Sequence, residues 1–136
     1  MRGQAGFTLL ELLVVLVILG MLAAIAAPRV LGLLGGAKAD AAKVQIQGLS
    51  TTLDLFWLEN GRYPTEQEGL AALVEKPAAV PAWSGPYVKS KDSLIDPWGR
   101  PYLYRQPGRH GDYDLFTLGA DAREGGDGEN GDVTSW

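Results

Sequence analysis

The sequence contains no cysteine and only one histidine, and its twelve Lys and Arg residues are outnumbered by sixteen Asp and Glu residues. Without cysteine the chain has no disulfide, no thiolate nucleophile and no cysteine-based zinc site. The formal net charge of −4 and the scattered basic residues argue against a nucleic-acid partner, because phosphate neutralisation needs clustered Lys and Arg. Function therefore has to come from carboxylates, from packing or from apolar surface.

The sequence also lacks a recognisable catalytic constellation. His110 lies between Arg109 and Gly111 in a predicted turn, where a solvated surface residue is favoured over a general base. No nucleophile motif of the G-x-S-x-G type accompanies it. The four tryptophans are better explained by packing than by ligand stacking. We therefore expect a protein that is not an enzyme, although a signal-anchored periplasmic hydrolase is the alternative from another class.

The N-terminal part begins with a short polar and basic leader, residues 1–6, followed by an apolar run that reaches Pro28. A helix over residues 7–28 would be about 33 Å long, which is enough to span a bilayer. Because the bulk of the chain follows this span, a single pass with a cytoplasmic N-terminus is favoured. An ordinary secretory signal, cleaved near residues 23–27, is the alternative interpretation.

Glu11 is an ionisable residue inside this apolar run. The apolar region of a simple secretory signal is expected to be uncharged, so Glu11 argues against that interpretation. A carboxylate in hydrocarbon is costly unless it is paired, and such residues are functional by default. Glu11 is therefore a candidate assembly residue that needs a cation, with snorkelling of its side chain to the membrane interface as the alternative.

An amphipathic helix is predicted for residues 29–61, as a continuation of the membrane segment. Its apolar positions recur at spacings of four and three, which indicates one buried stripe. The stripe consists of Ala42, Ile46, Leu49, Leu53 and Phe56. Asn60 and Gly61 form a stop signal. Pro28 and several glycines, including Gly20, predict a bend or local melting of the helix.

The remaining segment, residues 62–136, is predicted to be a small globular domain. Thr65 and Glu68 have the spacing of a capping box, which predicts a short second helix. Residues 102–104 and 113–118 alternate as half-buried strands do, and turn residues separate them. The expected fold is α+β, with a long helical spine packed on a small antiparallel sheet and a C-terminal acidic loop.

The acidic loop is rich in carboxylates and glycine between residues 121 and 132. Calcium prefers six to eight oxygen ligands, and glycine lets backbone carbonyls turn inward. The spacing of an EF-hand loop is missing, and an ordinary solvated loop is the alternative interpretation. The candidate calcium-binding loop is residues 118–133.

Residues 6–11 read Gly-Phe-Thr-Leu-Leu-Glu, which resembles the type IV prepilin processing site of pilins and pseudopilins. Later segments resemble the signatures of the major pseudopilin family of bacterial type II secretion systems. They are residues 60–65, 69–73, 96–99, 113–116 and 118–121. The resemblance implies that a prepilin peptidase cuts between Gly6 and Phe7 and methylates the Phe7 amine. It also implies that this ammonium, in a neighbouring subunit, pairs with Glu11.

The same resemblance implies a bound calcium ion where type IV pilus subunits usually have a disulfide, which fits the absence of cysteine. The implied ligands are the Leu118 carbonyl and the side chains of Asp121 and Asp132. The choice among Glu124, Asp127 and Asn130 stays open. Where the family tends to end Ile-Gly-Asn-Trp, residues 133–136 read Val-Thr-Ser-Trp, so the resemblance does not define the backbone of the final turn.

The function implied by the resemblance is structural. Subunits are expected to leave the bacterial inner membrane, with their C-terminal domains in the periplasm, and to stack into a periplasmic pseudopilus that helps to export folded proteins. The implied partners are further copies of the chain, minor pseudopilins, an inner-membrane assembly platform and the prepilin peptidase. A type IV pilus subunit or a minor pseudopilin is the closest alternative.

Overall fold

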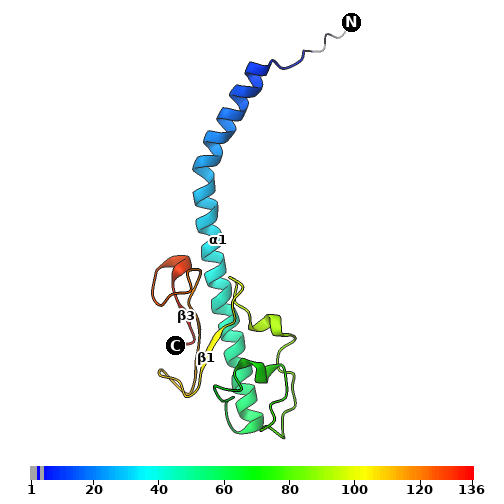
Figure 1. Ribbon diagram of the computed structural model, residues 1–136, viewed down its shortest axis with the longest axis vertical. Helices are drawn as coiled ribbons and strands as arrows, with labels where there is room; N and C mark the ends of the chain where they lie inside the picture. The colour runs from blue at the N-terminus through cyan, green and yellow to red at the C-terminus, as the bar shows by residue number, and fades with distance from the viewer. Residues whose placement is uncertain (1–2, 4) are drawn as a thin grey trace. The chain divides into compact units, whose positions relative to one another are not determined.

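The computed structural model describes residue 3 and residues 5–136. The predicted leader, residues 1–6, therefore lies partly outside the described residues. The chain divides into two compact units, Met1–Leu34 and Gly35–Trp136, and one helix, α1 (Leu9–Asn60), runs through both (Figure 1). Within the described residues, the strands all belong to the second unit.

Helix α1 remains helical through Gly20 and Pro28, so the expected local melting is wrong for the isolated chain. Pro28 removes one backbone donor, while the alanines that precede it favour helix. Unwinding inside a filament stays a prediction. The predicted stop is confirmed: Gly61 has a φ of 75°, and its N–H donates to the carbonyl of Trp57 at 2.7 Å. This left-handed glycine ends the helix because it satisfies one of the last free carbonyls.

The C-terminal half of α1 presents the predicted apolar stripe to the core of the second unit. All five predicted stripe residues are buried, and Leu53 and Phe56 are 0% exposed. Ile46, Leu49, Leu53 and Phe56 join one cluster with residues of the loops and strands, including Leu73, Tyr102 and Leu115. Full burial of such a side chain contributes about 1.5–3 kcal/mol, so this stripe anchors the domain to the helix.

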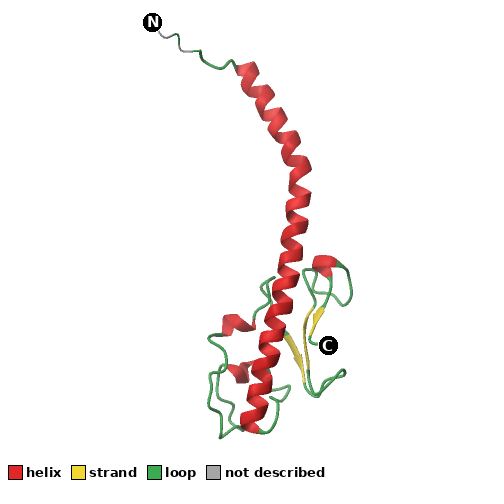
Figure 2. Cartoon of the chain, turned by 180° about the vertical axis from the view of Figure 1, so that it is seen from behind, coloured by secondary structure: helices red, strands yellow, loops and turns green. Residues whose placement is uncertain are grey.

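The sheet has three antiparallel strands in the order β1 (Leu103–Arg105), β2 (Asp114–Thr117) and β3 (Val133–Thr134). Leu103 pairs with Phe116, and Phe116 pairs with Thr134 on the other side. The strands lie beside the C-terminal half of α1 (Figure 2). The predicted α+β fold is confirmed, with β1 and β2 close to the predicted segments.

Strand β3 was not predicted. It is extended by hydrogen bonds from the Ser135 N–H to the Leu115 carbonyl at 2.9 Å and from the Leu115 N–H to the Ser135 Oγ at 3.1 Å. Residues 133–135 therefore complete the sheet. Because β2 and β3 are paired, the acidic loop between them is closed by backbone hydrogen bonds.

The predicted second helix is a single 3-10 turn, Leu70–Leu73, preceded by the predicted capping box. The Thr65 N–H donates to Glu68 Oε2 at 2.8 Å, and the Glu68 N–H donates to Thr65 Oγ1 at 3.2 Å. Both guanidinium nitrogens of Arg62 also bind the Glu68 carboxylate, at 2.7 and 2.8 Å. These bonds lower the pKa of Glu68 to about 2, and the hydrogen bonding from Arg62 has the largest effect. Two more 3-10 helices span Lys91–Leu94 and Gly128–Asn130.

Replacing Glu68 with glutamine should lower the free energy of unfolding at pH values above 4.5, the ordinary pKa of the carboxyl group. Because the folded-state pKa is depressed, the stabilisation is complete above 4.5 and is lost as the pH falls towards about 2. We expect about 1–2 kcal/mol, since Arg62 is partly exposed and screened. Urea unfolding of wild type and Glu68→Gln should differ at pH 7 and converge near pH 2. A constant difference across this range would contradict the assignment.

Candidate functional site

The N-terminal site is the start of α1. The Thr8 N–H donates to Glu11 Oε2 at 2.9 Å, and the Glu11 N–H donates to Thr8 Oγ1 at 3.2 Å. This reciprocal pair is a capping box, and it places a negative charge in the first turn, where the helix dipole favours it. In the isolated chain Glu11 therefore caps its own helix. Sequence reasoning missed Thr8, although Thr-x-x-Glu before an apolar run was the available signal.

The expected cleavage position lies immediately before the helix. Gly6 and Phe7 have non-helical backbone, and Phe7 is 82% exposed. A Cβ added at Gly6 would meet no atom within 4 Å. The peptide bond between them is thus accessible in this chain, and the chain itself imposes no steric need for glycine at position 6.

The apolar surface of α1 is open in the isolated chain. Its large apolar side chains between Leu9 and Leu34 are all exposed. Within the described residues α1 is the one helix that is long and apolar enough to cross a membrane, with a window of mean hydropathy 2.9 that is 0% buried. So much exposed apolar area needs a covering environment, either lipid or other helices.

The acidic loop, taken from here on as all the residues between β2 and β3 (118–132), folds tightly. Gly119 has a φ of 73°, and a Cβ there would lie 2.6 Å from the carbonyl oxygen of Gly131. Gly126 has a φ of 91°, and a Cβ there would lie 2.5 Å from the carbonyl oxygen of Asn130. The first limb of the loop, which begins at Leu118, and the second limb, which ends at Asp132, therefore have their backbones in direct contact. Only glycine leaves room for this contact, because it has no side chain.

The structure brings part of the implied calcium ligand set together. Leu118, Glu124 and Asp132 line one cleft of about 340 Å³, which Arg105, Arg109 and His110 also line. Asp121, Asp127 and Asn130 do not line it. One oxygen of Asp132 accepts the Gly125 N–H at 3.0 Å, and one oxygen of Asp121 accepts the Arg123 N–H at 3.1 Å. Among the described residues no three acidic or histidine side chains converge on one point.

The donor chemistry of the loop nevertheless suits calcium. The acidic side chains at positions 121, 124, 127 and 132 are all exposed, and each supplies oxygen only. The carboxylates of Asp121 and Asp132 each keep a second oxygen beyond the one that binds the loop backbone. Of the candidate ligands, the Leu118 carbonyl, Glu124 and Asp132 would be the ones nearest an ion in the cleft, and the ion would neutralise the charge of the two carboxylates.

His110 belongs to a buried carboxylate cluster that sequence reasoning missed. Its Nδ1 lies 3.2 Å from Asp114 Oδ2, and its ring stacks on Trp136 with centroids 3.9 Å apart. Burial alone would raise the pKa of Asp114, but the N–H groups of Arg109 and His110 and the His110 ring hold it below its usual value. Because Asp114 is 0% exposed and begins β2, the cluster fixes the preceding turn to the sheet.

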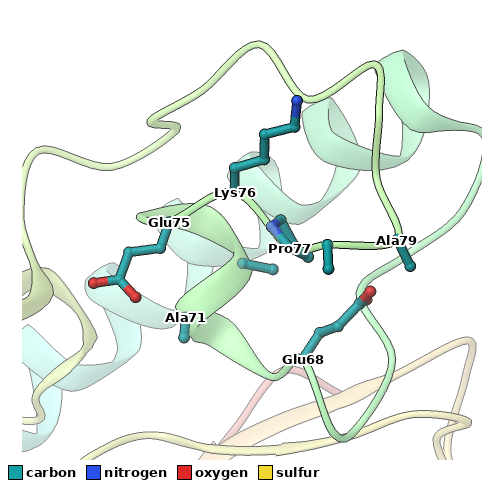
Figure 3. A pocket seen from close by; sticks show the side chains of 8 residues that line it. Glu68, Ala71, Glu75, Lys76, Pro77 and Ala79 are labelled. Atoms are coloured by element: carbon teal, nitrogen blue, oxygen red, sulfur yellow. The ribbon is translucent and has the colours of Figure 1, made fainter.

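A shallow cleft beside the 3-10 turn Leu70–Leu73 is lined mostly by alanine and proline (Figure 3). Both of its carboxylates are occupied. Glu68 is bound by Arg62, as described above, and Glu75 Oε1 lies 2.6 Å from Lys91 Nζ. Neither Glu68 nor Glu75 is therefore available as a general acid or base in this cleft.

Comparisons with known proteins agree with these features. A family model described as "Type II secretion system (T2SS), protein G" matches residues 29–136, and one described as "Prokaryotic N-terminal methylation motif" matches residues 1–27. Type II secretion system core protein G of Pseudomonas aeruginosa is 45% identical over 99% of this chain and 96% of its own length. The Vibrio cholerae protein of the same name is 45% identical over 100% and 94%.

A solved structure also resembles this one. The crystal structure of the major pseudopilin from the type 2 secretion system of enterohaemorrhagic Escherichia coli matches with a TM-score of 0.60 and 33% identity. The match covers 74% of this chain and 87% of that chain.

A processing motif, a long exposed apolar helix and a small α+β domain without cysteine define a pilin-like subunit. The chain belongs to the type II secretion system protein G family. The expected resemblance is therefore confirmed, and the alternatives, a type IV pilus subunit or a minor pseudopilin, are not favoured.

Proposed function

We propose that this chain is the structural subunit of a periplasmic pseudopilus and polymerises through α1 to drive export of folded proteins across the outer membrane. The observation that carries the proposal is the N-terminal methylation motif, which matches residues 1–27 and includes the start of the exposed apolar helix. Before assembly, lipid of the inner membrane covers this helix, and in the filament the helices of other copies replace the lipid. The chemistry is assembly, so the chain acts as a structural subunit.

The proposed topology places residues 7–28 across the inner membrane once, with the C-terminal domain in the periplasm. The prepilin peptidase would cut between Gly6 and Phe7 and methylate the new amine. The inner-membrane assembly platform would then extract the processed subunit, and minor pseudopilins would complete the filament. The methylation motif supports the processing step, and the type II secretion system names of the relatives support assembly within that system.

Electron microscopy of cells that overproduce the full chain tests polymerisation, and intact-mass measurement tests processing. We expect short filaments built from chains that begin with methylated Phe7. Chains that retain residues 1–6, or processed chains that form no filament together with the other secretion components, would overturn the proposal.

We further propose that the acidic loop binds one calcium ion through the Leu118 carbonyl, Asp121 and Asp132, with Glu124, Asp127 and Asn130 as further candidates. Clustered carboxylates repel one another, and a glycine-rich backbone gains entropy when it opens. A shared cation opposes both effects. Support comes from the oxygen-only donor set of the loop and from the cleft that Leu118, Glu124 and Asp132 share. Asp121 lies outside this cleft, and Arg105 and Arg109 line it, so the ion would have to draw Asp121 in and compete with these two cations.

Removal of calcium should lower the melting temperature of the full chain in detergent micelles. Calcium at about one hundred times its dissociation constant would stabilise the folded state by about 2.7 kcal/mol. Asp121→Ala and Asp132→Ala should abolish this response, whereas Asp112→Ala, which changes an exposed carboxylate outside the loop, should retain it. Identical melting curves in calcium and in chelator would show that the loop is only solvated.

A further inference from the structure

The turn Asp96–Arg100 is held by one buried carboxylate. Asp96 is 4% exposed, and its Oδ1 accepts the N–H groups of Trp98 at 3.0 Å and Arg100 at 2.9 Å. Its Oδ2 accepts the Thr117 hydroxyl at 2.5 Å. Because Thr117 belongs to β2, the turn is fixed to the sheet directly before the acidic loop begins. The backbone that carries the side chains of Trp98 and Arg100 is therefore fixed in position.

The Arg100 guanidinium reaches the first limb of the loop. One nitrogen, Nη2, donates to the Gly119 carbonyl, and the other, Nη1, donates to the Ala120 carbonyl at 3.5 Å. These carbonyls lie between two implied calcium ligands, Leu118 and Asp121. A charged donor to carbonyl oxygens is stronger than a neutral one, so Arg100 acts on this limb as a fixed cation.

The Trp98 indole reaches the second limb from the same turn. Its Nε1 donates to Glu129 Oε1 at 3.2 Å, while the Glu129 carbonyl accepts the Ala120 N–H at 2.9 Å. The Glu129 side chain also lies directly on α1. A Cβ added at Gly35 would be 2.5 Å from Glu129 Oε2. Glu129 is thus hydrogen-bonded to the turn through Trp98 and to the first limb through Ala120. Its side chain also packs on the backbone of α1 at Gly35.

We propose that the turn Asp96–Arg100 clamps both limbs of the acidic loop, with Arg100 and Trp98 as positioning residues that set the loop geometry before any ion binds. Arg100 holds the limb that presents Leu118 and Asp121, and Trp98 holds the limb that leads to Asp132. A calcium ion then meets a loop that is already arranged. Only this last consequence rests on the proposed calcium binding.

The clamp is tested by hydrogen exchange of the Ala120 amide, measured by NMR on the full chain in detergent micelles with chelator present. Arg100→Met removes the guanidinium and keeps the apolar stem, so the Ala120 amide should exchange about tenfold faster. Trp98→Phe keeps a ring and removes the indole donor, and should give a smaller acceleration. Arg123→Met, which changes an exposed arginine of the same loop, should leave the exchange unchanged.

A core amide separates this effect from general destabilisation. The Tyr102 N–H donates to the Leu94 carbonyl at 3.0 Å and should exchange at the wild-type rate in all three variants. Arg100→Lys should recover part of the Ala120 protection, because it restores the charge without the fork. The clamp is wrong if Arg100→Met and Arg123→Met give the same Ala120 rate, or if Ala120 and Tyr102 accelerate together.

A calcium titration of the same variants tests the link to ion binding. Arg100→Met should bind calcium about tenfold more weakly than wild type, since the lost arrangement must then be formed on binding. Equal calcium affinity in the two proteins would overturn this link. If wild type itself shows no calcium response, the ion proposal fails, while the exchange measured in chelator still decides the clamp.

Discussion

Filaments should be absent when Glu11 is replaced by leucine, although the chain still inserts into the membrane. Leucine lowers the cost of the apolar span, so insertion is unchanged or improved. Assembly fails because the Phe7 ammonium of the neighbouring subunit loses its partner. Two unit charges about 4 Å apart attract by about 4 kcal/mol at an effective dielectric near 20. Loss of half of this energy weakens each contact about thirtyfold. Membrane fractionation and electron microscopy measure the two effects.

Glu11→Gln is the matched control, because Glu11 also caps its own helix through Thr8. Glutamine can take the same place in a capping box, but it carries no charge. We expect Glu11→Gln to fail in assembly as Glu11→Leu does. Thr8→Val should instead weaken the helix start by about 1 kcal/mol while the carboxylate remains, and should still assemble. Wild-type filament formation by Glu11→Gln would show that the charge has no role.

Processing should stop when Gly6 is replaced by leucine. The peptidase has to accept the residue before Phe7, and a bulky side chain there should slow cleavage by at least about tenfold, which corresponds to about 1.4 kcal/mol of lost transition-state stabilisation. Intact mass should then show chains that retain residues 1–6 and an unmethylated N-terminus. Because the leader would hold the amine away from Glu11, filaments should also disappear.

Gly3→Leu is the matched control for this experiment. A Cβ at Gly3 or at Gly6 meets no atom of the chain within 4 Å, so neither change disturbs the chain's own packing. Gly3→Leu should be processed and should assemble normally. Recovery of methylated Phe7 from the Gly6→Leu chain would contradict the assigned cleavage position.

The carboxylates of the acidic loop and of the N-terminal site lie in different environments. Glu11 needs a partner because it lies in an apolar segment, and its own helix supplies only N–H donors in the isolated chain. The loop carboxylates at positions 121, 124, 127 and 132 are exposed and can be solvated, so the proposed ion would order the loop rather than offset the burial of charge. Their test is therefore thermal stability, whereas the test for Glu11 is assembly.

The sequence by itself determined the elements whose signals are local. The spacing of the stripe from Ala42 to Phe56, the stop at Gly61 and the capping box at Thr65 each depend on residues a few positions apart. Hydrophobic periodicity and helix capping act over one or two turns, so they can be recognised without knowledge of the tertiary structure. The processing motif, residues 6–11, is equally local, and it identified the class of protein.

The tertiary structure alone decided how the acidic loop is held. Strand β3 is only two residues long, too short for an alternating pattern, and it exists because β2 offers a free edge. Trp98 and Glu129 are 31 positions apart, and Arg100 and Gly119 are 19 apart. No periodicity links such residues, because their contact depends on the path of the whole chain between them. The sequence indicated which oxygens are available to an ion, and the fold decided that Leu118, Glu124 and Asp132 line one cleft while Asp121 does not.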